Sequence, residues 1–227
     1  MAPPHALPFK LSGSLVADLP DALKDAVFVI DDFYANPLAV RAFALGTLYT
    51  PRQEEANFAG RESAQSFPAT DIQARFSAIL GRGVEPSGPG HIYGRFRYAL
   101  AQEQGATDVH VDDSDWTAVI YLGEAHGQRA GLVFYEHKAT GLQSVPDSRE
   151  LHALGFGSTA QFDANVICAD TNTPDAWRIL GEVEYQFNRC VIFRGNRLFH
   201  GIADTFGCSM SDARLTQNFF LREVAET

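Results

Sequence analysis

His110 and Asp112 are separated by one residue in the stretch His110-Val111-Asp112. In an extended chain the side chains at positions i and i+2 leave the same face, so the imidazole and the carboxylate can converge on one ion. His200 follows 200 − 112 = 88 residues after the carboxylate and is the best candidate for a third ligand. Two histidines and one carboxylate on one face of an octahedron leave the opposite positions open, as in non-haem iron(II) sites. The sequence therefore predicts an iron(II) centre.

The His-x-Asp spacing is weak evidence by itself, because an isolated histidine is more often a surface or hydrogen-bonded residue than a metal ligand. Two further carboxylates, Asp113 and Asp115, lie nearby but lack the i+2 relation to His110, so we interpret them as loop residues or as residues that surround the ligands. The other histidines of the chain have no comparable setting: His5, His91, His126, His137 and His152.

A strand-like segment that begins at Arg214 follows His200 by 214 − 200 = 14 residues. Its polarity alternates, so Arg214, Thr216 and Asn218 are expected on one face. A buried dicarboxylate needs a planar, bidentate cation for its far carboxylate, and a guanidinium beside a hydroxyl provides this better than an ammonium. The alternative is that Arg214 is a surface residue at the start of a strand and that Thr216 simply favours β structure.

The elements that must position these residues change in character along the chain. The pattern predicts a short buried strand at 26–30, a helix from Pro37 to about Leu48 with Asn36 as its N-cap, and a second helix at 71–80. Apolar β-branched and aromatic runs then predict strands at 92–100, 116–122, 132–136, 190–193 and 215–221. Helices followed by strands favour an α+β, mainly β fold: a double-sheet jelly roll with the N-terminal helices packed on one sheet.

The segment 138–184 has a mixed pattern, in which a helix is predicted near 175–180. A structureless loop of this length would be unusual in a compact domain, so we interpret 138–184 as an insertion that shapes the substrate site. A chain of 227 residues suits one domain, here 1–227.

The charge and composition exclude several classes of partner. With 18 Lys+Arg against 28 Asp+Glu, the formal net charge is -10, which does not suit a nucleic acid or an anionic membrane surface. No apolar run is long enough for a signal-peptide core or a membrane span, so a cytoplasmic location is expected. The three cysteines are widely and irregularly spaced and are expected to be ordinary thiols: Cys168, Cys190 and Cys208.

Taken in order, these motifs resemble the iron(II) and 2-oxoglutarate-dependent dioxygenases. The resemblance is closest to the prolyl-4-hydroxylase-like branch and, within the superfamily, to an uncharacterised bacterial group of oxygenases. It covers roughly 92–221 and, more loosely, 27–45. The matching motifs are Arg97-Tyr98, Gly105, His110-Val111-Asp112, Trp116-Thr117-Ala118-Val119-Ile120-Tyr121-Leu122, Ala130-Gly131-Leu132-Val133-Phe134, Asn188-Arg189-Cys190-Val191-Ile192-Phe193, His200-Gly201-Ile202 and Arg214-Leu215-Thr216.

The resemblance implies a double-stranded β-helix, that is, a cupin-like jelly roll, with iron and catalysis at His110, Asp112 and His200. The reaction it implies is hydroxylation of an amino acid, a peptidyl side chain or a small metabolite by O2, with release of succinate and CO2 and with ascorbate as a supporting reductant. Related halogenases replace the carboxylate ligand by a small residue, so Asp112 favours hydroxylation. Desaturation and ring formation stay open.

The resemblance also implies the cosubstrate site. Arg214 would bind the C5 carboxylate of 2-oxoglutarate with the help of Thr216, and Tyr98 matches a tyrosine that reaches the cosubstrate, although a core aromatic is an equal interpretation. Relatives usually have Gly-Gly where this chain has Ala130-Gly131, and many prolyl hydroxylases have lysine in place of Arg214. Nothing matches 138–184, which leaves the substrate open.

Two other classes of protein remain as alternatives. The first is a cupin-like metal-binding protein or isomerase that uses the same ligands without 2-oxoglutarate. The second is a structural or interaction module with a vestigial metal site. The sequence does not set the oligomeric state.

Overall fold

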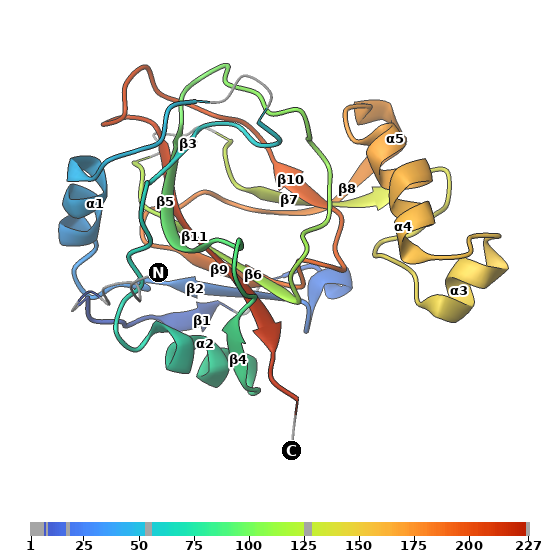
Figure 1. Ribbon diagram of the computed structural model, residues 1–227, viewed down its shortest axis with the longest axis horizontal. Helices are drawn as coiled ribbons and strands as arrows, with labels where there is room; N and C mark the ends of the chain where they lie inside the picture. The colour runs from blue at the N-terminus through green and yellow to red at the C-terminus, as the bar shows by residue number, and fades with distance from the viewer. Residues whose placement is uncertain (1–6, 8, 17–18, 53–55, 125–128, 226–227) are drawn as a thin grey trace.

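A computed structural model describes residues 7, 9–16, 19–52, 56–124 and 129–225, and within them the chain forms two antiparallel sheets (Figure 1). The larger, eight-stranded sheet has the strand order β1-β2-β9-β6-β11-β5-β3, with β4 paired to β11. Its strands are β1 (Ser14–Val16), β2 (Val27–Asp31), β3 (Arg61–Glu62), β4 (Val84–Pro86), β5 (Tyr93–Ala99), β6 (Trp116–Tyr121), β9 (Cys190–Phe193) and β11 (Arg214–Glu223). The smaller sheet has the order β10-β7-β8. Its strands are β7 (Leu132–His137), β8 (Trp177–Val183) and β10 (His200–Ile202).

Helices occur between the strands along the chain. The α-helices are α1 (Pro37–Gly46), α2 (Ile72–Leu80), α3 (Ser148–Ala153), α4 (Thr159–Phe162) and α5 (Cys168–Asp170). Short 3-10 segments occur at η1 (Asp21–Leu23) and η3 (Pro174–Ala176), and a π-helical turn, η2 (Asp163–Ile167), joins α4 to α5. As predicted, Pro37 starts α1 and the Asn36 side chain accepts the Ala39 N–H, which caps it. Gly81 ends α2 at a φ of 65, a conformation that glycine adopts without strain.

The two faces of the large sheet pack against different partners. On one face, Val40 of α1 and Phe76 of α2 share a core with sheet residues such as Ile120. On the other face, Val191 of β9 packs with Phe134 of the small sheet. The alternation of side chains along each strand separates these two cores. The prediction of a mainly β fold with early helices is confirmed.

The register of β11 fixes what faces the small sheet. Leu215 lies in the core beneath the helices, so its neighbours Arg214 and Thr216 point to the opposite face. Thr216 pairs with Arg97 of β5 on one side and with Tyr121 of β6 on the other.

The helix predicted near 175–180 is wrong. The structure places β8 there, paired with β7 along six positions from Leu132↔Val183 to His137↔Trp177. Pairing with β7 and burial of Trp177 and Val183 outweigh the local helical pattern. The last part of 138–184 therefore belongs to the small sheet, whereas α3, α4 and α5 form a separate outer layer (Figure 1). No helix among the described residues is long and apolar enough to cross a bilayer.

Candidate metal centre

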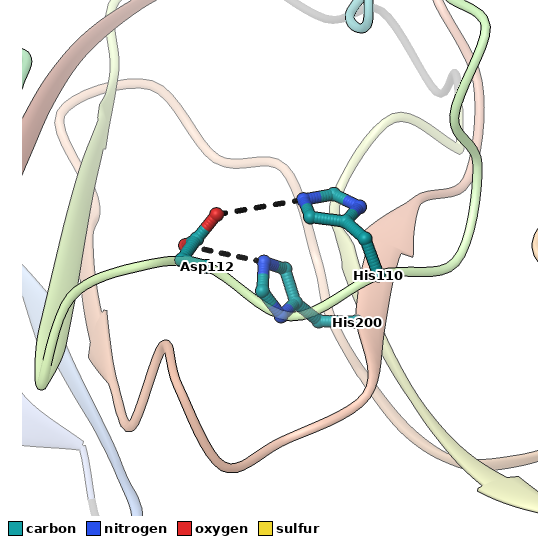
Figure 2. Close-up of side chains that lie close together, drawn as sticks. All are labelled: His110, Asp112 and His200. Atoms are coloured by element: carbon teal, nitrogen blue, oxygen red, sulfur yellow. Dashed lines mark ion pairs between the residues drawn. The ribbon is translucent and has the colours of Figure 1, made fainter. Parts of the chain in front are cut away.

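The side chains of His110, Asp112 and His200 converge on one point (Figure 2). One nitrogen or oxygen from each lies within 4.8 Å of the other two. The Nε2 atom of His110 is 3.6 Å from Asp112 Oδ1, and the Nε2 atom of His200 is 3.3 Å from Asp112 Oδ2. The three ligands that the sequence suggests are thus close enough to hold one metal ion.

Backbone hydrogen bonds bring the three ligands together across 88 residues of chain (200 − 112). His110 and His200 form an antiparallel bridge in which each N–H donates to the other residue's carbonyl at 2.9 Å. The Asp112 N–H donates to the Gly195 carbonyl at 2.8 Å. A Cβ at Gly195 would lie 2.5 Å from Thr117 Oγ1 and 3.1 Å from Asp112 Cβ, so glycine permits this close approach.

Each imidazole is oriented by its other ring nitrogen. His110 Nδ1 lies 2.8 Å from the Asp108 carbonyl oxygen, and His200 Nδ1 lies 2.9 Å from that of Leu198. A carbonyl oxygen only accepts, so in each pair Nδ1 carries the proton and donates it. The lone pair is then on Nε2, the atom that faces Asp112, as a metal site requires.

The Asp112 carboxylate is ionised and tethered. Burial raises its pKa, but when the metal-free imidazoles of His200 and His110 carry a second proton on Nε2, their charges and hydrogen bonds outweigh burial and hold the pKa well below the usual range of an aspartate. The Thr117 hydroxyl donates a hydrogen bond to Oδ2, and the Ser114 hydroxyl lies 3.0 Å from that of Thr117. The sequence did not single out Thr117, because a threonine at the start of a strand is explained by β propensity alone.

The helical layer holds the residue before each histidine. Val109 and Phe199 are buried in one cluster with Phe162 and Trp177. Thr171, just after α5, donates its hydroxyl to the Val109 carbonyl at 2.8 Å, and its own carbonyl accepts the Val109 N–H at 3.1 Å. The segment 138–184 therefore contacts the chain at both histidines.

A cavity of about 530 Å³ opens beside the three ligands. Thr117 and Phe193 of the large sheet line one side, and Leu132 and Ile202 of the small sheet line the other. Among the described residues, the segment 138–184 contributes Asn172 to the lining of this cavity.

Arg214 and Thr216 line the same cavity. The Arg214 side chain is buried, its Nε donates to the Ala130 carbonyl at 2.9 Å, and its Cζ lies 5.5 Å from the Tyr185 ring centroid. Burial lowers the pKa of Arg214, and the groups that act on its charge are two tyrosines and Arg97. No described carboxylate is among them. A buried guanidinium without an anionic partner is costly, so its position suits a bound anion.

The structure does not bring Tyr98 to the cavity. Tyr98 pairs with Leu215 on the face beneath the helices, where its ring centroid lies 4.8 Å from that of Tyr49. Because side chains alternate along β5, Arg97 and Ala99 point to the cavity instead. Strand β5, which the resemblance indicated, does line the cavity, but through Arg97 and Ala99 and not through Tyr98.

The remaining polar residues near the motif have other surroundings. Asp113 is exposed, and Asp115 accepts hydrogen bonds from Asn196 and from the Glu223 N–H. His137 lies 3.0 Å from an Asp170 oxygen, away from the three ligands. His5 and His126 lie outside the described residues.

Comparisons with known proteins identify a family without a known activity. Among solved structures, the chain is similar to the selenomethionine-labelled Fe(II)/α-ketoglutarate-dependent dioxygenase TqaL, at 12% sequence identity and a TM-score of 0.39, over 85% of this chain and 76% of that one. A similarity this weak supports no conclusion about activity. No curated protein matches. The model of the family of unknown function DUF6445 matches residues 19–221, and the chain therefore belongs to this family.

Proposed function

We propose that the protein is a non-haem iron(II) and 2-oxoglutarate-dependent oxygenase that hydroxylates an amino acid, a peptidyl side chain or a small metabolite and releases succinate and CO2. One observation carries the proposal: three side chains that could hold a metal ion line the same cavity as a buried guanidinium that has no carboxylate partner among the described residues. Two imidazole nitrogens and one carboxylate are the donor set of iron(II) oxygenase sites, and a guanidinium is the preferred partner of a carboxylate.

The residues divide the work between metal and cosubstrate. His110, Asp112 and His200 would hold one face of the iron. Bound iron(II), with 2-oxoglutarate and O2, would supply the oxidising chemistry. Arg214 would bind the far carboxylate of 2-oxoglutarate beside the Thr216 hydroxyl, in a setting that excludes water and so strengthens the charge pairing. Tyr98 has no part in this proposal.

The proposal extends to the fold. Two sheets that face each other across a ligand cavity are the arrangement of a double-sheet jelly roll, so we assign the chain to the double-stranded β-helix proteins. We treat 1–227 as one domain, with 138–184 as an insertion at the site. Placement in the prolyl-4-hydroxylase-like branch stays a prediction.

Succinate release tests the function. Purified protein with iron(II), ascorbate, O2 and 2-oxoglutarate should form succinate slowly without added substrate. Arg214→Ala should abolish it, because a buried charge-assisted pair at the far carboxylate is lost. Arg222→Ala is the matched control: Arg222 lies on the same strand but is exposed and pairs with Glu85, so turnover should persist.

Binding measurements with iron(II) and 2-oxoglutarate separate the alternatives. Metal binding without detectable 2-oxoglutarate binding under anaerobic conditions would refute the oxygenase and favour a cupin-like protein or isomerase. No stoichiometric iron binding, with no effect of His110→Ala, would favour a structural module.

A further inference from the structure

Arg97 faces the metal cavity from the strand next to Arg214. In the β5–β11 register Arg97 is opposite Thr216, and Asn218 is opposite Arg95. Arg97 and Asn218 are thus diagonal neighbours on one face of the sheet, within reach of one small ligand. Both line the cavity. The function proposed above uses neither of them.

Among the described residues that surround Glu62, positive charge exceeds negative charge. An Nη2 atom of Arg97 donates to Glu62, and Arg95 Nη1 lies 3.5 Å from the other oxygen of the same carboxylate. Two guanidiniums therefore share one described carboxylate. Arg97 Nε is buried without a hydrogen-bond partner among the described residues, so the donors of Arg97 are not all used.

The aromatic ring of Phe58 lies near both Arg97 and His110. The Phe58 ring centroid is 4.7 Å from that of His110, and Arg97 Cζ is 5.4 Å from the Phe58 centroid. A ligand held at Arg97 would therefore lie close to the metal. Arg214, by contrast, packs on Tyr185 and Tyr121. The cavity thus has two separate arginines, one of which the cosubstrate leaves free.

We propose that Arg97 and Asn218 bind a carboxylate of the substrate, so that the substrate is a small organic acid or amino acid with a free carboxylate. This inference rests on the proposed function of the same cavity. A guanidinium and a side-chain amide both donate to carboxylate oxygens, and the hydrogen bond from Nη2 to Glu62 restrains the Arg97 side chain. A peptidyl substrate without a terminal carboxylate would leave this positive charge without an anionic partner in the substrate.

Acetate and its neutral isostere acetamide test the inference without knowledge of the substrate. The protein is loaded with Mn(II) and saturated with 2-oxoglutarate, and proton relaxation of each probe's methyl group is measured by NMR. Relaxation of acetate should exceed that of acetamide several-fold, because only acetate is held near the paramagnetic ion. Arg97→Gln should reduce the acetate effect to the acetamide level, whereas the exposed Arg222→Gln should leave it unchanged.

A second variant keeps the inference testable if Arg97→Gln fails to fold. Asn218→Asp puts a like charge beside the bound carboxylate and should also weaken the acetate effect. Equal relaxation of the two probes, or an acetate effect that both variants retain, would overturn the inference. Failure of the wild-type protein to bind 2-oxoglutarate with Mn(II) would instead refute the proposed function, so the two failures are distinguishable.

Discussion

Each ligand of the proposed iron site is held by a hydrogen bond to a residue that is not itself one of the three ligands. The two imidazoles donate to backbone carbonyls, and Asp112 accepts from Thr117. Such bonds fix the orientation of a ligand before the metal arrives, so less conformational freedom is lost on binding. The affinity of the site therefore depends on residues that never touch the ion.

Thr117→Val should weaken iron(II) binding by roughly 10- to 100-fold, the usual effect of losing a hydrogen bond that orients a ligand. Valine keeps the shape and β propensity of threonine but removes the donor to Asp112. The iron(II) dissociation constant, measured anaerobically by competition with a chromophoric chelator, checks this. The exposed Thr173→Val is the control. Unchanged affinity in Thr117→Val would mean that Asp112 needs no such tether.

The sequence singled out His110, Asp112, His200 and Arg214 by residue type, spacing and resemblance, and the structure brings all four to one cavity. The sequence missed Thr117 and Gly195, whose importance lies in contacts between segments distant in the chain. It placed Tyr98 at the cosubstrate, whereas the register of β5 turns that residue to the other face. An error of one position in a strand reverses the face of the sheet.

Among the elements, the helical layer α3–α5 sets the position of the chain that carries both histidines. Val109 and Phe199 anchor that chain in the layer's core. Thr171 adds a hydrogen bond to the Val109 carbonyl and accepts one from the Asp108 N–H at 3.2 Å. We interpret 138–184 as a support for the histidines as well as a wall of the site.

Thr171→Val should loosen the segment before His110 and lower iron(II) affinity, with a smaller effect on the unfolding midpoint. The reason is that the hydroxyl serves a loop next to a ligand, whereas the hydrophobic cluster that holds the layer stays intact. Metal titration together with thermal unfolding of the metal-free protein separates the two effects. A comparable decrease in iron(II) affinity and in the thermal unfolding midpoint would show a purely structural role for Thr171.

The elements with a clear apolar pattern were predictable from the sequence, whereas β8 and β10 were not. The helix at α1 and the long strands β5, β6 and β11 follow from capping residues and apolar runs. Strand β8 was missed, because its sequence lacks clear alternation and its pairing with β7 decides its conformation. Strand β10 has three residues, too few for any pattern.

Several tyrosines lie wholly or partly buried in the folded protein, which favours the protonated form of each hydroxyl. Burial is the main cause that raises the pKa of Tyr93, Tyr135 and Tyr185 to about 12 each. The ordinary tyrosine pKa of 10.0 applies in the unfolded chain, so above pH 10 the unfolded state binds fewer protons than the folded state. The contribution of these tyrosines to the free energy of unfolding is therefore fully present below pH 10 and is lost as the pH rises towards about 12.

Urea unfolding at several alkaline pH values should show this loss. A single buried tyrosine such as Tyr185 contributes a slope of about 1.4 kcal/mol per pH unit in that window. Tyr185→Phe should make the slope shallower and also lower stability at neutral pH, because the Tyr185 hydroxyl donates to the Leu215 carbonyl at 2.6 Å. A midpoint that does not change between pH 9 and pH 11, on the order of one unit either side of the ordinary tyrosine value, would contradict the prediction.

The proposed function requires that one cavity hold both the metal and 2-oxoglutarate. A crystal structure of the protein with Mn(II) and 2-oxoglutarate tests it most directly. We expect the ion bonded to the Nε2 atoms of His110 and His200 and to an Asp112 oxygen. We expect the far carboxylate of 2-oxoglutarate on the Arg214 guanidinium. An ion bound elsewhere, or 2-oxoglutarate absent from Arg214, would contradict the account.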